Sequence, residues 1–366
     1  MIVAGEASGD LHAAGLAAAL RRRHPDWRLT GMGGARMVAA GVEVIERTDA
    51  TAVMGFVEVL RTLPRHLALL QSFRKRLESG AVSCLVTIDY PGFNLRLAAA
   101  ARAANVPVLY YITPQVWAWG ADRLPKMARL ITKAAVILPF EEELLRAHRI
   151  DATFVGHPLL DRAAGMPDQA GARDALGVPR DARVLALFPG SRQQEIDRHL
   201  DAFVATARLL EGEHPGLVVL VATAPGMVID PARCPYRQVT ELSLSVLRAA
   251  DAAVCKSGTT TLEAAVAGCP LVVAYRTSPW THAIARRVVR IPRIGLVNVV
   301  AGREVAREFV QSDVVPASMA RAMSPLLIQG TPERVQMEAG LKEVRDRLGS
   351  PGASERVAAI VESLVT

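Results

Sequence analysis

The stretch VCKSGTTTLEAAVAGCPLVVAYR, residues Val254–Arg276, contains the pattern that decides the fold. It begins and ends with short apolar runs typical of buried strands, and the residues between them predict a loop of small residues followed by a helix. Parallel strands need a crossover of this kind, because a tight turn cannot join them. We therefore predict a strand–loop–helix–strand unit, the repeating unit of an α/β fold.

The loop of this unit is a candidate phosphate site. It contains Ser257, Gly258 and Thr259 at the point where a strand passes into a helix. Free N–H groups and the positive end of the helix dipole attract anions there. Glu263, in the first helical turn, would repel a phosphate and is better suited to accept hydrogen bonds from ribose hydroxyls. The spacing Thr260-x-x-Glu263 also fits a capping box, which needs no ligand.

Length and charge limit the classes of protein that this chain can form. A chain of 366 residues exceeds one ordinary core, so two domains are expected. Lysine and arginine outnumber the acids by 43 − 36 = 7, which favours phosphates or acidic lipid surfaces as partners. Only 5% of the residues are aromatic, and none alternate with basic residues, so nucleic acid is not expected.

Cysteine usage and hydropathy predict the compartment. The cysteines, Cys84, Cys234, Cys255 and Cys269, form no CxxC pair and lie mostly in apolar runs. They are typical of small buried side chains in a reducing compartment. No signal-peptide pattern opens the chain, and no apolar run reaches membrane-spanning length. We therefore expect a cytoplasmic protein.

Apolar runs alternate with helical patterns along the chain, which predicts two α/β domains with parallel sheets. Further strands are predicted at Met1–Ala4, Cys84–Ile88, Val106–Ile112, Ala134–Leu138, Thr153–Val155, Val184–Phe188 and Leu217–Ala222. Between Ala163 and Arg183 the composition turns to Gly, Pro, Asp and Arg, as in a domain boundary. We predict an N-terminal domain over residues 1–165, a C-terminal domain over 166–340 and a helical segment over 341–366. That segment could return to the first domain or reach a partner chain.

Polar residues follow two of the N-terminal strands. Ligands of open α/β sheets bind at the carboxyl ends of the strands, so Asp89, directly after Cys84–Ile88, is a candidate site residue. It could instead be the N-cap of the next helix, with Pro91 in the first turn. The loop Gly5–Asp10 follows the first strand, and its glycines allow a close approach to a ligand. Asp10 could equally be a helix N-cap.

A third polar loop follows the strand Val184–Phe188. Gly190 and Ser191 offer backbone donors, and Arg192 offers a guanidinium fork for phosphate. No Asp-x-Asp sequence occurs in the chain, and no histidine pair has zinc spacing. A diphosphate would therefore be neutralised by helix N-termini and arginines without a metal. Asp89 could accept the proton of an attacking hydroxyl.

Residues Ala52–Leu77 predict a helix with more apolar positions than one core-facing stripe needs. The stripe consists of Phe56, Leu60, Leu63, Leu67 and Leu70, the additional apolar residues are Val57, Val59, Leu69 and Phe73, and the interspersed cations are Arg61, Arg65, Arg74, Lys75 and Arg76. One interpretation is a core helix kinked at Pro64. The other is a surface that receives acyl chains or lies on an anionic membrane. A second basic amphipathic segment, or a solvated helix face, is predicted at Trp280–Arg293.

Short motifs in a fixed order cover nearly the whole chain. They are GEASGD at Gly5–Asp10, AVMGFVEVL at Ala52–Leu60, DYPGFN at Asp89–Asn94, PQVWAW at Pro114–Trp119, LPFE at Leu138–Glu141, GHPLLD at Gly156–Asp161, PGSR at Pro189–Arg192, SGTTTLEAAVAGCP at Ser257–Pro270 and NVVAGREV at Asn298–Val305. In these motifs the chain resembles the lipid-A-disaccharide synthases. That family consists of inverting glycosyltransferases of the GT-B type, in which two Rossmann-like domains face each other across a cleft.

The resemblance implies a reaction. A 2,3-diacylglucosaminyl group would pass from UDP to the 6-hydroxyl of 2,3-diacylglucosamine 1-phosphate, giving a β-1,6-linked disaccharide 1-phosphate and UDP. The resemblance also implies a peripheral enzyme on the cytoplasmic face of the inner membrane of a Gram-negative cell, with no cofactor beyond the UDP of its donor and no metal. A homodimer is compatible with it.

The resemblance further implies roles for individual residues. Asp89 would be the general base. The acceptor-side residues would be Glu6, Ser8 and Asp10; the UDP-binding residues would be Gly190, Ser191, Arg192, Ser257, Gly258, Thr259, Glu263, Asn298 and Glu304; the acyl or membrane contacts would be Val57, Val59, Leu60, Leu63 and Leu67. The chain departs from many relatives at Gly120, where they carry arginine, and at Gly92, where some carry a second aspartate.

Two other functions fit the same pattern less well. A nucleotide-sugar 2-epimerase of the same fold would not need the apolar surface expected at Phe56–Phe73. A non-catalytic protein that binds lipid or nucleotide would not need a carboxylate such as Asp89.

Overall fold

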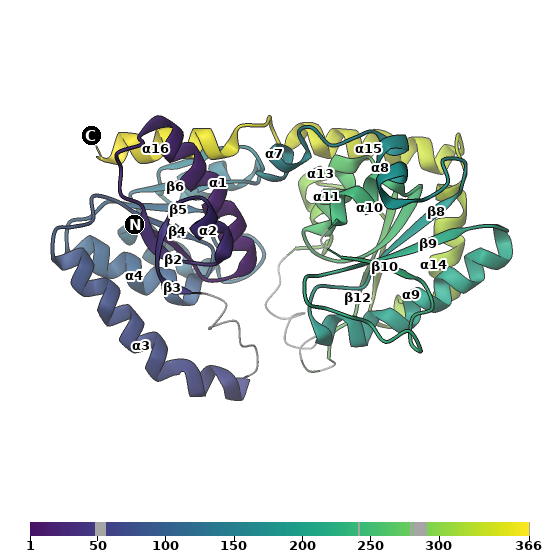
Figure 1. Cartoon of the computed structure of the whole chain (residues 1–366), viewed down its shortest axis with the longest axis horizontal. Coiled ribbons are helices and arrows are strands. Elements are labelled where there is room, and N and C mark those ends of the chain that lie inside the picture. The colour runs from purple at the N-terminus through teal and green to yellow at the C-terminus, as the bar shows by residue number, and fades with distance from the viewer. Residues whose placement is uncertain (48–55, 241, 279, 281–290, 366) are drawn as a thin grey trace. The chain divides into compact units, whose positions relative to one another are not determined.

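The computed structural model describes residues 1–47, 56–240, 242–278, 280 and 291–365, with the backbone alone for 56–65. The chain divides into two compact units. Unit 1 consists of Met1–Pro158 and Ser350–Thr366, and unit 2 consists of Leu159–Gly349. The prediction of two α/β domains is confirmed, and each unit is described separately (Figure 1).

Unit 1 contains a parallel sheet in which the described strands have the order β3-β2-β1-β4-β5-β6-β7. The strands are β1 (Ile2–Ala4), β2 (Thr30–Gly33), β3 (Glu43–Arg47), β4 (Leu85–Ile88), β5 (Val108–Tyr111), β6 (Lys133–Val136) and β7 (Ala152–Phe154). The order runs one way from β1 to β3 and the other way from β4 to β7. The loops after β1 and β4 therefore diverge, and the carboxyl ends of these two strands form the switch point, here called the crevice, at which open α/β sheets bind ligands.

Helices cover both faces of this sheet. They are α1 (Ala7–Arg23), α2 (Ala35–Ala39), α3 (Phe56–Glu78), α4 (Pro91–Ala103), α5 (Leu124–Leu130), α6 (Glu141–Ala147) and α16 (Ala353–Val365), and a 3-10 turn (Ala121–Arg123) precedes α5. One core cluster joins α1, α2 and α16 to the strands, and a second joins α3 and α4 to them. A third lies under α5 and α6. Side chains of every central strand are thus buried on both faces, as parallel sheets require.

The C-terminal helix α16 packs on α1 in unit 1 (Figure 1). Val357 and Val361 of α16 share a core cluster with Leu20 of α1. A Cβ atom at Gly15 would lie 2.9 Å from Ser354 Oγ, so the small residue allows this close approach. The segment predicted to return or to reach a partner therefore returns to the unit in which the chain begins.

Unit 2 contains a second parallel sheet, whose described strands have the order β10-β9-β8-β11-β12-β13. The strands are β8 (Val184–Phe188), β9 (Val218–Thr223), β10 (Arg237–Thr240), β11 (Ala252–Lys256), β12 (Leu271–Tyr275) and β13 (Glu308–Val310). The direction of the strand order reverses between β8 and β11. The loops after these two strands flank the second crevice.

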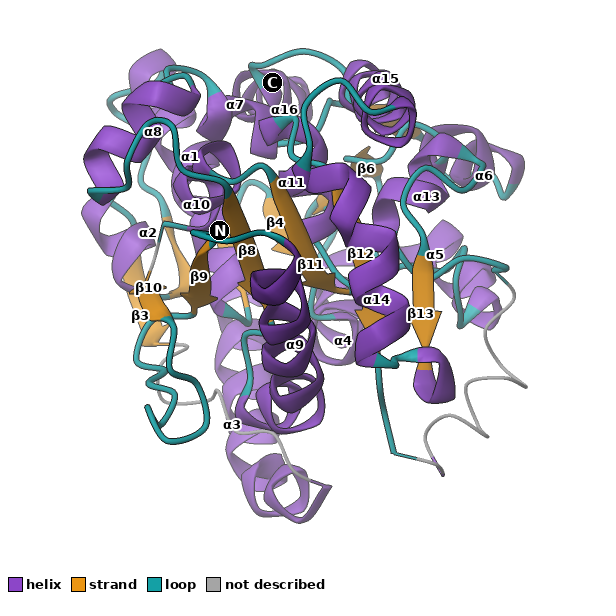
Figure 2. Cartoon of the chain, turned by 90° about the vertical axis from the view of Figure 1, so that its right-hand side faces the viewer, coloured by secondary structure: helices purple, strands orange, loops and turns teal. Residues whose placement is uncertain are grey.

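Helices also cover both faces of the second sheet. They are α7 (Leu159–Ala163), α8 (Gln169–Leu176), α9 (Gln193–Glu213), α10 (Ser243–Ala249), α11 (Thr260–Ala267), α13 (Leu296–Ala301), α14 (Pro316–Met323) and α15 (Pro332–Arg347), with 3-10 turns at Gln311–Asp313 and Ser324–Leu327. Helices α9 and α14 lie side by side over one face (Figure 2). Their apolar residues form one core with β8 and β11. The predicted strand–loop–helix–strand unit is confirmed as β11, α11 and β12.

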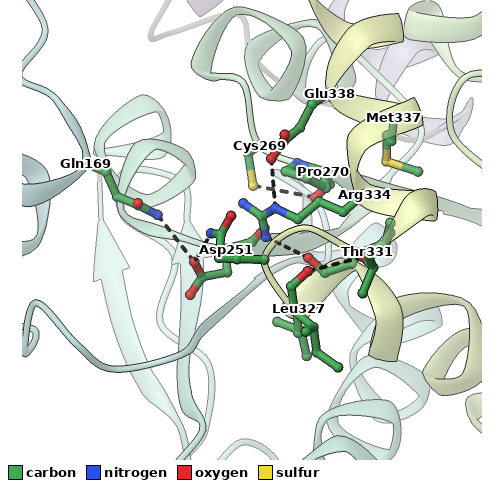
Figure 3. A network of polar contacts seen from close by, with 12 residues as sticks. Gln169, Asp251, Cys269, Pro270, Leu327, Thr331, Arg334, Met337 and Glu338 are labelled. Carbon is green, nitrogen blue, oxygen red and sulfur yellow. Dashed lines mark hydrogen bonds and ion pairs between the residues drawn. The ribbon is translucent and has the colours of Figure 1, made fainter.

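A buried ionic network fixes α15 and α8 to the sheet of unit 2 (Figure 3). The Asp251 carboxylate accepts from Arg173 Nη2 at 2.9 Å and from the Val184 backbone N–H at 2.8 Å. Arg334 of α15 donates through Nη1 to the backbone oxygens of Asp251 and Leu326, at 2.9 and 2.7 Å. Because these groups lie in the interior, loss of one partner would leave a buried charge uncompensated.

The observed boundaries differ from the predicted ones. The predicted division at 340/341 falls inside α15, which Arg334 holds in unit 2, so the chain leaves this unit at 349/350. The first boundary lies at 158/159 rather than 165/166, because α7 packs on α11 and its Arg162 pairs with Glu263. Four strands, β2, β3, β10 and β13, were not predicted. They are short, and β2 has the sequence TGMG, which lacks an apolar pattern.

We expect Val357→Ala to destabilise unit 1 by about 2 kcal/mol, because it removes buried carbon atoms and leaves a small cavity under α16. Urea unfolding followed by tryptophan fluorescence would measure the loss. Ser363→Ala changes an exposed residue of the same helix and should leave the transition unchanged. Equal stability of Val357→Ala and the parent protein would contradict the packing of α16 on α1.

Candidate active site

Asp89 lies directly after β4, at the crevice of unit 1, in a strained turn. Asp89 and Tyr90 both have left-handed backbone conformations, with φ of 46° and 47°. Such conformations are costly for residues other than glycine and persist only where the surroundings impose them. Here the Asp89 carbonyl oxygen accepts from Asn94 Nδ2 and from the Tyr110 hydroxyl, both at 2.7 Å. Tyr90, not Asp89, is the N-cap of α4, so the alternative role of Asp89 as N-cap is wrong.

The surroundings of Asp89 favour proton uptake. Burial raises the pKa of its carboxyl group, and the negative charge of Glu6 raises it further. The Tyr90 backbone N–H opposes this shift with a hydrogen bond. A carboxylate with a raised pKa is a better general base than an ordinary aspartate, because its affinity for the transferred proton is higher.

Tyr90 connects three segments around this turn. A Cβ atom at Gly5 would lie 2.3 Å from the Tyr90 ring, so the ring lies directly against the backbone of the loop after β1. The Tyr90 hydroxyl is 2.8 Å from His66 Nε2 on α3. The Tyr90 ring also stacks on Phe93. The loop at Gly5, the Asp89 turn and α3 are therefore held in one arrangement.

The predicted acceptor-side residues lie at different depths. Ser8 is exposed on the first turn of α1, and Glu6 is the half-buried N-cap of that helix. The buried Asp10 carboxylate accepts from the backbone N–H groups of Gly34 and Met37 through Oδ1, at 2.7 and 3.1 Å, and from Arg36 through Oδ2, at 3.1 Å. Asp10 therefore caps α2 rather than its own helix, which corrects the N-cap alternative.

Glu141 is a second buried acid at the carboxyl ends of the strands of unit 1, where it begins the helix that follows β6. Its carboxylate accepts from Trp117 Nε1 and from the Leu138 backbone N–H, each at 3.1 Å. Burial raises its pKa to about 7, although these hydrogen bonds oppose the shift. Trp117 also packs edge-on against Phe140. Trp117 is therefore a packing anchor, whereas Trp119 is 44% exposed and Arg123 lies over its ring.

In unit 2 the loop after β11 has the predicted position. Thr259, not Thr260, is the N-cap of α11, so the capping box predicted at Thr260-x-x-Glu263 is not formed, and the Thr259 side chain makes no capping hydrogen bond either. The Ser257 hydroxyl donates to the Ile294 carbonyl at 2.7 Å, and the Thr261 hydroxyl donates to the Gly258 carbonyl at 2.9 Å. These bonds fix the loop and leave the exposed Thr259 at the start of the helix.

Glu263 lies in the first turn of α11 and is 8% exposed. Its Oε1 lies 3.2 Å from Arg162 Nη1 of α7. The ribose-binding role predicted for Glu263 therefore involves a carboxylate that is already paired with an arginine. A carboxylate has two oxygens with several acceptor positions, so this pairing leaves Glu263 able to accept a further hydrogen bond from a hydroxyl.

The loop after β8 contains Gly190, Ser191 and Arg192. Gly190 has a φ of 138°, and a Cβ atom there would lie 2.4 Å from Glu195 Cβ. Ser191 and Arg192 are exposed, and Arg192 is the N-cap of α9. The Ser191 backbone N–H donates to Glu195 Oε2 at 2.9 Å.

The structure adds Lys256 to the residues predicted here. Its Nζ lies 2.7 Å from Glu195 Oε1, at the end of β11, the neighbour of β8. Sequence reasoning missed this residue, although its position directly before Ser257 places it at the edge of the predicted loop.

Asn298 and Glu304, both predicted to bind UDP, differ in exposure: Asn298 is buried and Glu304 is exposed. Asn298 is buried in α13, and its amide donates to the Ala306 carbonyl and Glu308 Oε1 and accepts from the N–H groups of Val305 and Ala306. Every hydrogen-bonding position of this side chain is used, so Asn298 shapes the loop that carries the exposed Glu304. Helix α13 ends at Ala301, and the rest of the NVVAGREV motif lies between this helix and β13.

The predicted acyl contacts lie on α3. The side chains of Val57, Val59, Leu60 and Leu63 lie outside the described residues. Leu67, which was assigned to the core-facing stripe, is 47% exposed, whereas Leu69, Phe73 and Leu77 are buried in the core. The predicted core-facing stripe is thus partly wrong, because the side of α3 that carries Leu69, Phe73 and Leu77 faces the core. Residues 281–290 of the second predicted basic segment also lie outside the described residues, and Trp280 at its start is 82% exposed.

Over the described part of the chain, no group of three or more His, Cys, Asp or Glu residues is placed to hold a metal ion. Within the same residues, no helix has the length and apolar composition needed to cross a bilayer. The four cysteines are buried and free, as predicted.

Solved structures with the same fold include a nucleotide-sugar epimerase and a glycosyltransferase. A putative UDP-N-acetylglucosamine 2-epimerase from Listeria monocytogenes has a TM-score of 0.67 at 12% identity, covering 99% of this chain and 95% of its own. The calicheamicin glycosyltransferase CalG4 has a TM-score of 0.63 at 18% identity, covering 100% and 97%. The two parallel sheets with a crevice at each order reversal thus define the GT-B class of fold.

Sequence comparison defines the family. The family model described as lipid-A-disaccharide synthetase matches residues 1–361. The lipid-A-disaccharide synthases of Myxococcus xanthus and Trichlorobacter lovleyi are 42% and 40% identical to the chain, and each alignment covers 100% of this chain and 97% of the relative. The chain therefore belongs to the lipid-A-disaccharide synthase family. It is a glycosyltransferase that makes the lipid A disaccharide, with a nucleotide sugar and a sugar phosphate as substrate classes.

We expect Glu141→Gln to change how the stability of unit 1 depends on pH. The pKa of Glu141 is about 7 in the folded protein against an ordinary value of 4.5, so the folded state holds a proton that the unfolded state has lost between these pH values. Glu141 therefore makes stability fall as pH rises from about 4.5 to about 7, by at most about 1.4 kcal/mol per pH unit. The glutamine variant lacks this decrease, and thermal unfolding at a series of pH values would measure the difference.

Glu143→Gln provides the control, because Glu143 is exposed on the same helix. If the glutamine variant at 141 and the control have the same pH dependence, Glu141 is not protonated in the folded protein at pH 6.

Proposed function

We propose that the chain transfers a 2,3-diacylglucosaminyl group from UDP to the 6-hydroxyl of 2,3-diacylglucosamine 1-phosphate, with inversion at the anomeric carbon. The full-length family match carries this proposal, and the polar residues at the two sheet crevices supply the groups that the reaction needs. The 2-epimerases share only the fold, at 12% identity for the Listeria protein, so nothing favours epimerisation.

Asp89 is the general base of this reaction. Its carboxylate takes the proton of the 6-hydroxyl as the hydroxyl oxygen forms a bond to the anomeric carbon. The bond between that carbon and the UDP oxygen breaks with its electron pair, so UDP leaves as an anion. The raised pKa of Asp89 and its fixed backbone support this role.

The loops after β8 and β11 hold the departing diphosphate. Backbone N–H groups at the starts of α9 and α11, together with Arg192, would stabilise the negative charge that develops. Glu263, paired with Arg162, would accept from the ribose. In this proposal neither a metal nor a cofactor takes part.

Helix α3 is the proposed contact with acyl chains and with the cytoplasmic face of the inner membrane. Leu67 presents apolar surface to solvent, and Arg74, Lys75 and Arg76 add positive charge toward the end of the helix. This combination is typical of interfacial helices on anionic lipid. The homodimer remains a prediction.

The direct test incubates the purified chain with UDP-diacylglucosamine and the monosaccharide 1-phosphate and follows both products. Formation of the disaccharide 1-phosphate and UDP in equal amounts is expected. Release of UDP without disaccharide would exclude the transferase reaction.

We expect Asp89→Asn to lower kcat by about 10² to 10⁴, the usual contribution of a general base, with UDP affinity unchanged. In the parent enzyme kcat/KM should rise with pH through a pKa above the ordinary 3.8 of aspartate, because only the charged carboxylate can accept the proton. Initial rates across pH would show both effects.

Asp122→Asn serves as the control, because it removes an exposed carboxylate from the 3-10 turn Ala121–Arg123 of unit 1. Full turnover by Asp89→Asn would remove the base assignment and leave the family membership intact.

We expect Leu67→Asp to weaken binding to acidic vesicles about tenfold, because it places a charge where apolar surface enters the lipid. Binding of the parent protein should also fall with added salt. Val335→Asp is a matched control, since Val335 is 54% exposed on α15 in the other unit. Equal losses in both variants, or no binding of the parent protein to vesicles at low salt, would contradict the assignment of α3.

A further inference from the structure

Lys256 and Glu195 form an ion pair between the two loops that flank the crevice of unit 2. Lys256 ends β11, and Glu195 lies in the first turn of α9, which follows β8. One carboxylate oxygen of Glu195 lies 2.7 Å from Lys256 Nζ, and the other accepts from the Ser191 backbone N–H at 2.9 Å. Their side chains are only 20% and 17% exposed.

The groups that hold the Glu195 carboxylate are those that hold a phosphate. An ammonium from one strand end and a backbone N–H from the adjacent one converge on a single anion. Carboxylate and phosphate oxygens accept the same charge-assisted hydrogen bonds. Burial opposes the ionisation of Glu195, but Lys256, the Ser191 N–H and Arg192 together keep its pKa below the ordinary value. Glu195 therefore places a negative charge at this point of the crevice.

The adjacent loops leave space beside this pair. Among the described residues, a Cβ atom at Gly258 would meet Lys256 Nζ alone within 4 Å, at 3.7 Å. The Lys256 ammonium thus lies next to the bare backbone of the loop after β11. A ligand phosphate on that loop would come within reach of Lys256 without moving the main chain.

We propose that Lys256 binds the diphosphate of the nucleotide sugar and that the Glu195 carboxylate occupies this position until the nucleotide arrives. This inference rests on the proposed function, because it assigns a new residue to the same diphosphate. When the nucleotide binds, a phosphate oxygen replaces the Glu195 carboxylate as the acceptor of the Ser191 N–H. The same phosphate forms an ion pair with Lys256. As UDP leaves, Glu195 returns and prevents rebinding of the product.

The two residues then have opposite effects on affinity. In this proposal Lys256 contacts the diphosphate and not the uridine. Its charge should therefore strengthen the binding of UDP and leave the binding of uridine unchanged. Glu195 competes with the diphosphate for the same donors, so removal of its charge should strengthen UDP binding. A purely structural ion pair would predict that loss of either partner weakens binding.

Calorimetric titration of the full chain with UDP and with uridine tests the proposal. We expect Lys256→Met to weaken UDP binding about tenfold and to leave uridine binding unchanged. Glu195→Gln should strengthen UDP binding about threefold, because the amide keeps the size of the side chain without its charge. Lys256→Arg, which retains a cation, should restore most of the affinity.

Lys342→Met is the matched control. Lys342 also belongs to unit 2 and also pairs with a carboxylate, Asp346, at 2.8 Å, but it lies on α15. Its replacement should leave UDP affinity unchanged. Thermal unfolding of each variant identifies a protein that has lost its fold, and Lys256→Gln, which also removes the cation, then replaces Lys256→Met in the comparison: a UDP affinity below that of the parent supports the proposal, and an equal affinity contradicts it.

The outcomes separate this inference from the function on which it rests. A parent chain that binds no UDP would overturn the proposed function. A parent chain that binds UDP, with Lys256→Met binding it equally well, would overturn the role of Lys256 alone. Weaker UDP binding by Glu195→Gln would show that Glu195 only positions the lysine, and the competition would be wrong.

Discussion

The reversal of strand order in each sheet is the constraint on which the candidate site depends. Parallel strands joined by right-handed crossovers place their helices on one face when the chain proceeds in one direction along the sheet and on the other face when it reverses. At the reversal the two neighbouring loops turn away from each other, and backbone groups at the strand ends stay uncovered. The reversals lie between β1 and β4 and between β8 and β11. Asp89 follows β4, and Lys256 ends β11.

The Asp89 turn shows how the surrounding structure supports strain at such a point. Two consecutive left-handed residues cost on the order of 1–3 kcal/mol each. The hydroxyl of Tyr110, a fully buried residue of β5, and the amide of Asn94 both donate to the Asp89 carbonyl oxygen. Such bonds contribute about 1 kcal/mol each and direct the carboxylate by fixing the peptide beside it. Since both donors are anchored in regular elements, the turn has one conformation even though its backbone is unfavourable.

The sequence allowed the prediction of elements with local signals, and it failed where contacts are distant along the chain. The unit β11–α11–β12 and the positions of Asp89 and Ser257 follow from apolar runs and strand ends. The hydrogen bonds of Asp10 reach residues 24 to 27 positions away, and the Lys256–Glu195 pair spans 61 positions, so no local pattern indicates them. The strand β2 contains two glycines, and it takes its extended form from pairing with β1 and β3, not from a local pattern. The core-facing side of α3 was wrong because the helix offers more apolar positions than one face can bury.

Asp89 and Glu141 of unit 1 have raised pKa values and Glu195 of unit 2 has a lowered one, and a glycosyl transfer needs both properties. At the strand ends of unit 1, burial raises the pKa of Asp89 and Glu141, and none of the described residues places a cation there that compensates for the lost hydration. At the strand ends of unit 2, Lys256 and a backbone N–H overcome the same burial and lower the pKa of Glu195. One edge is therefore suited to take up a proton, and the other to hold a negative charge. An attacking hydroxyl must lose a proton while the leaving group gains negative charge. Strand ends suited to proton uptake alone would favour only the first change, and strand ends suited to an anion alone would favour only the second. Division of the two properties between two sheets allows each pKa to be set by its own surroundings.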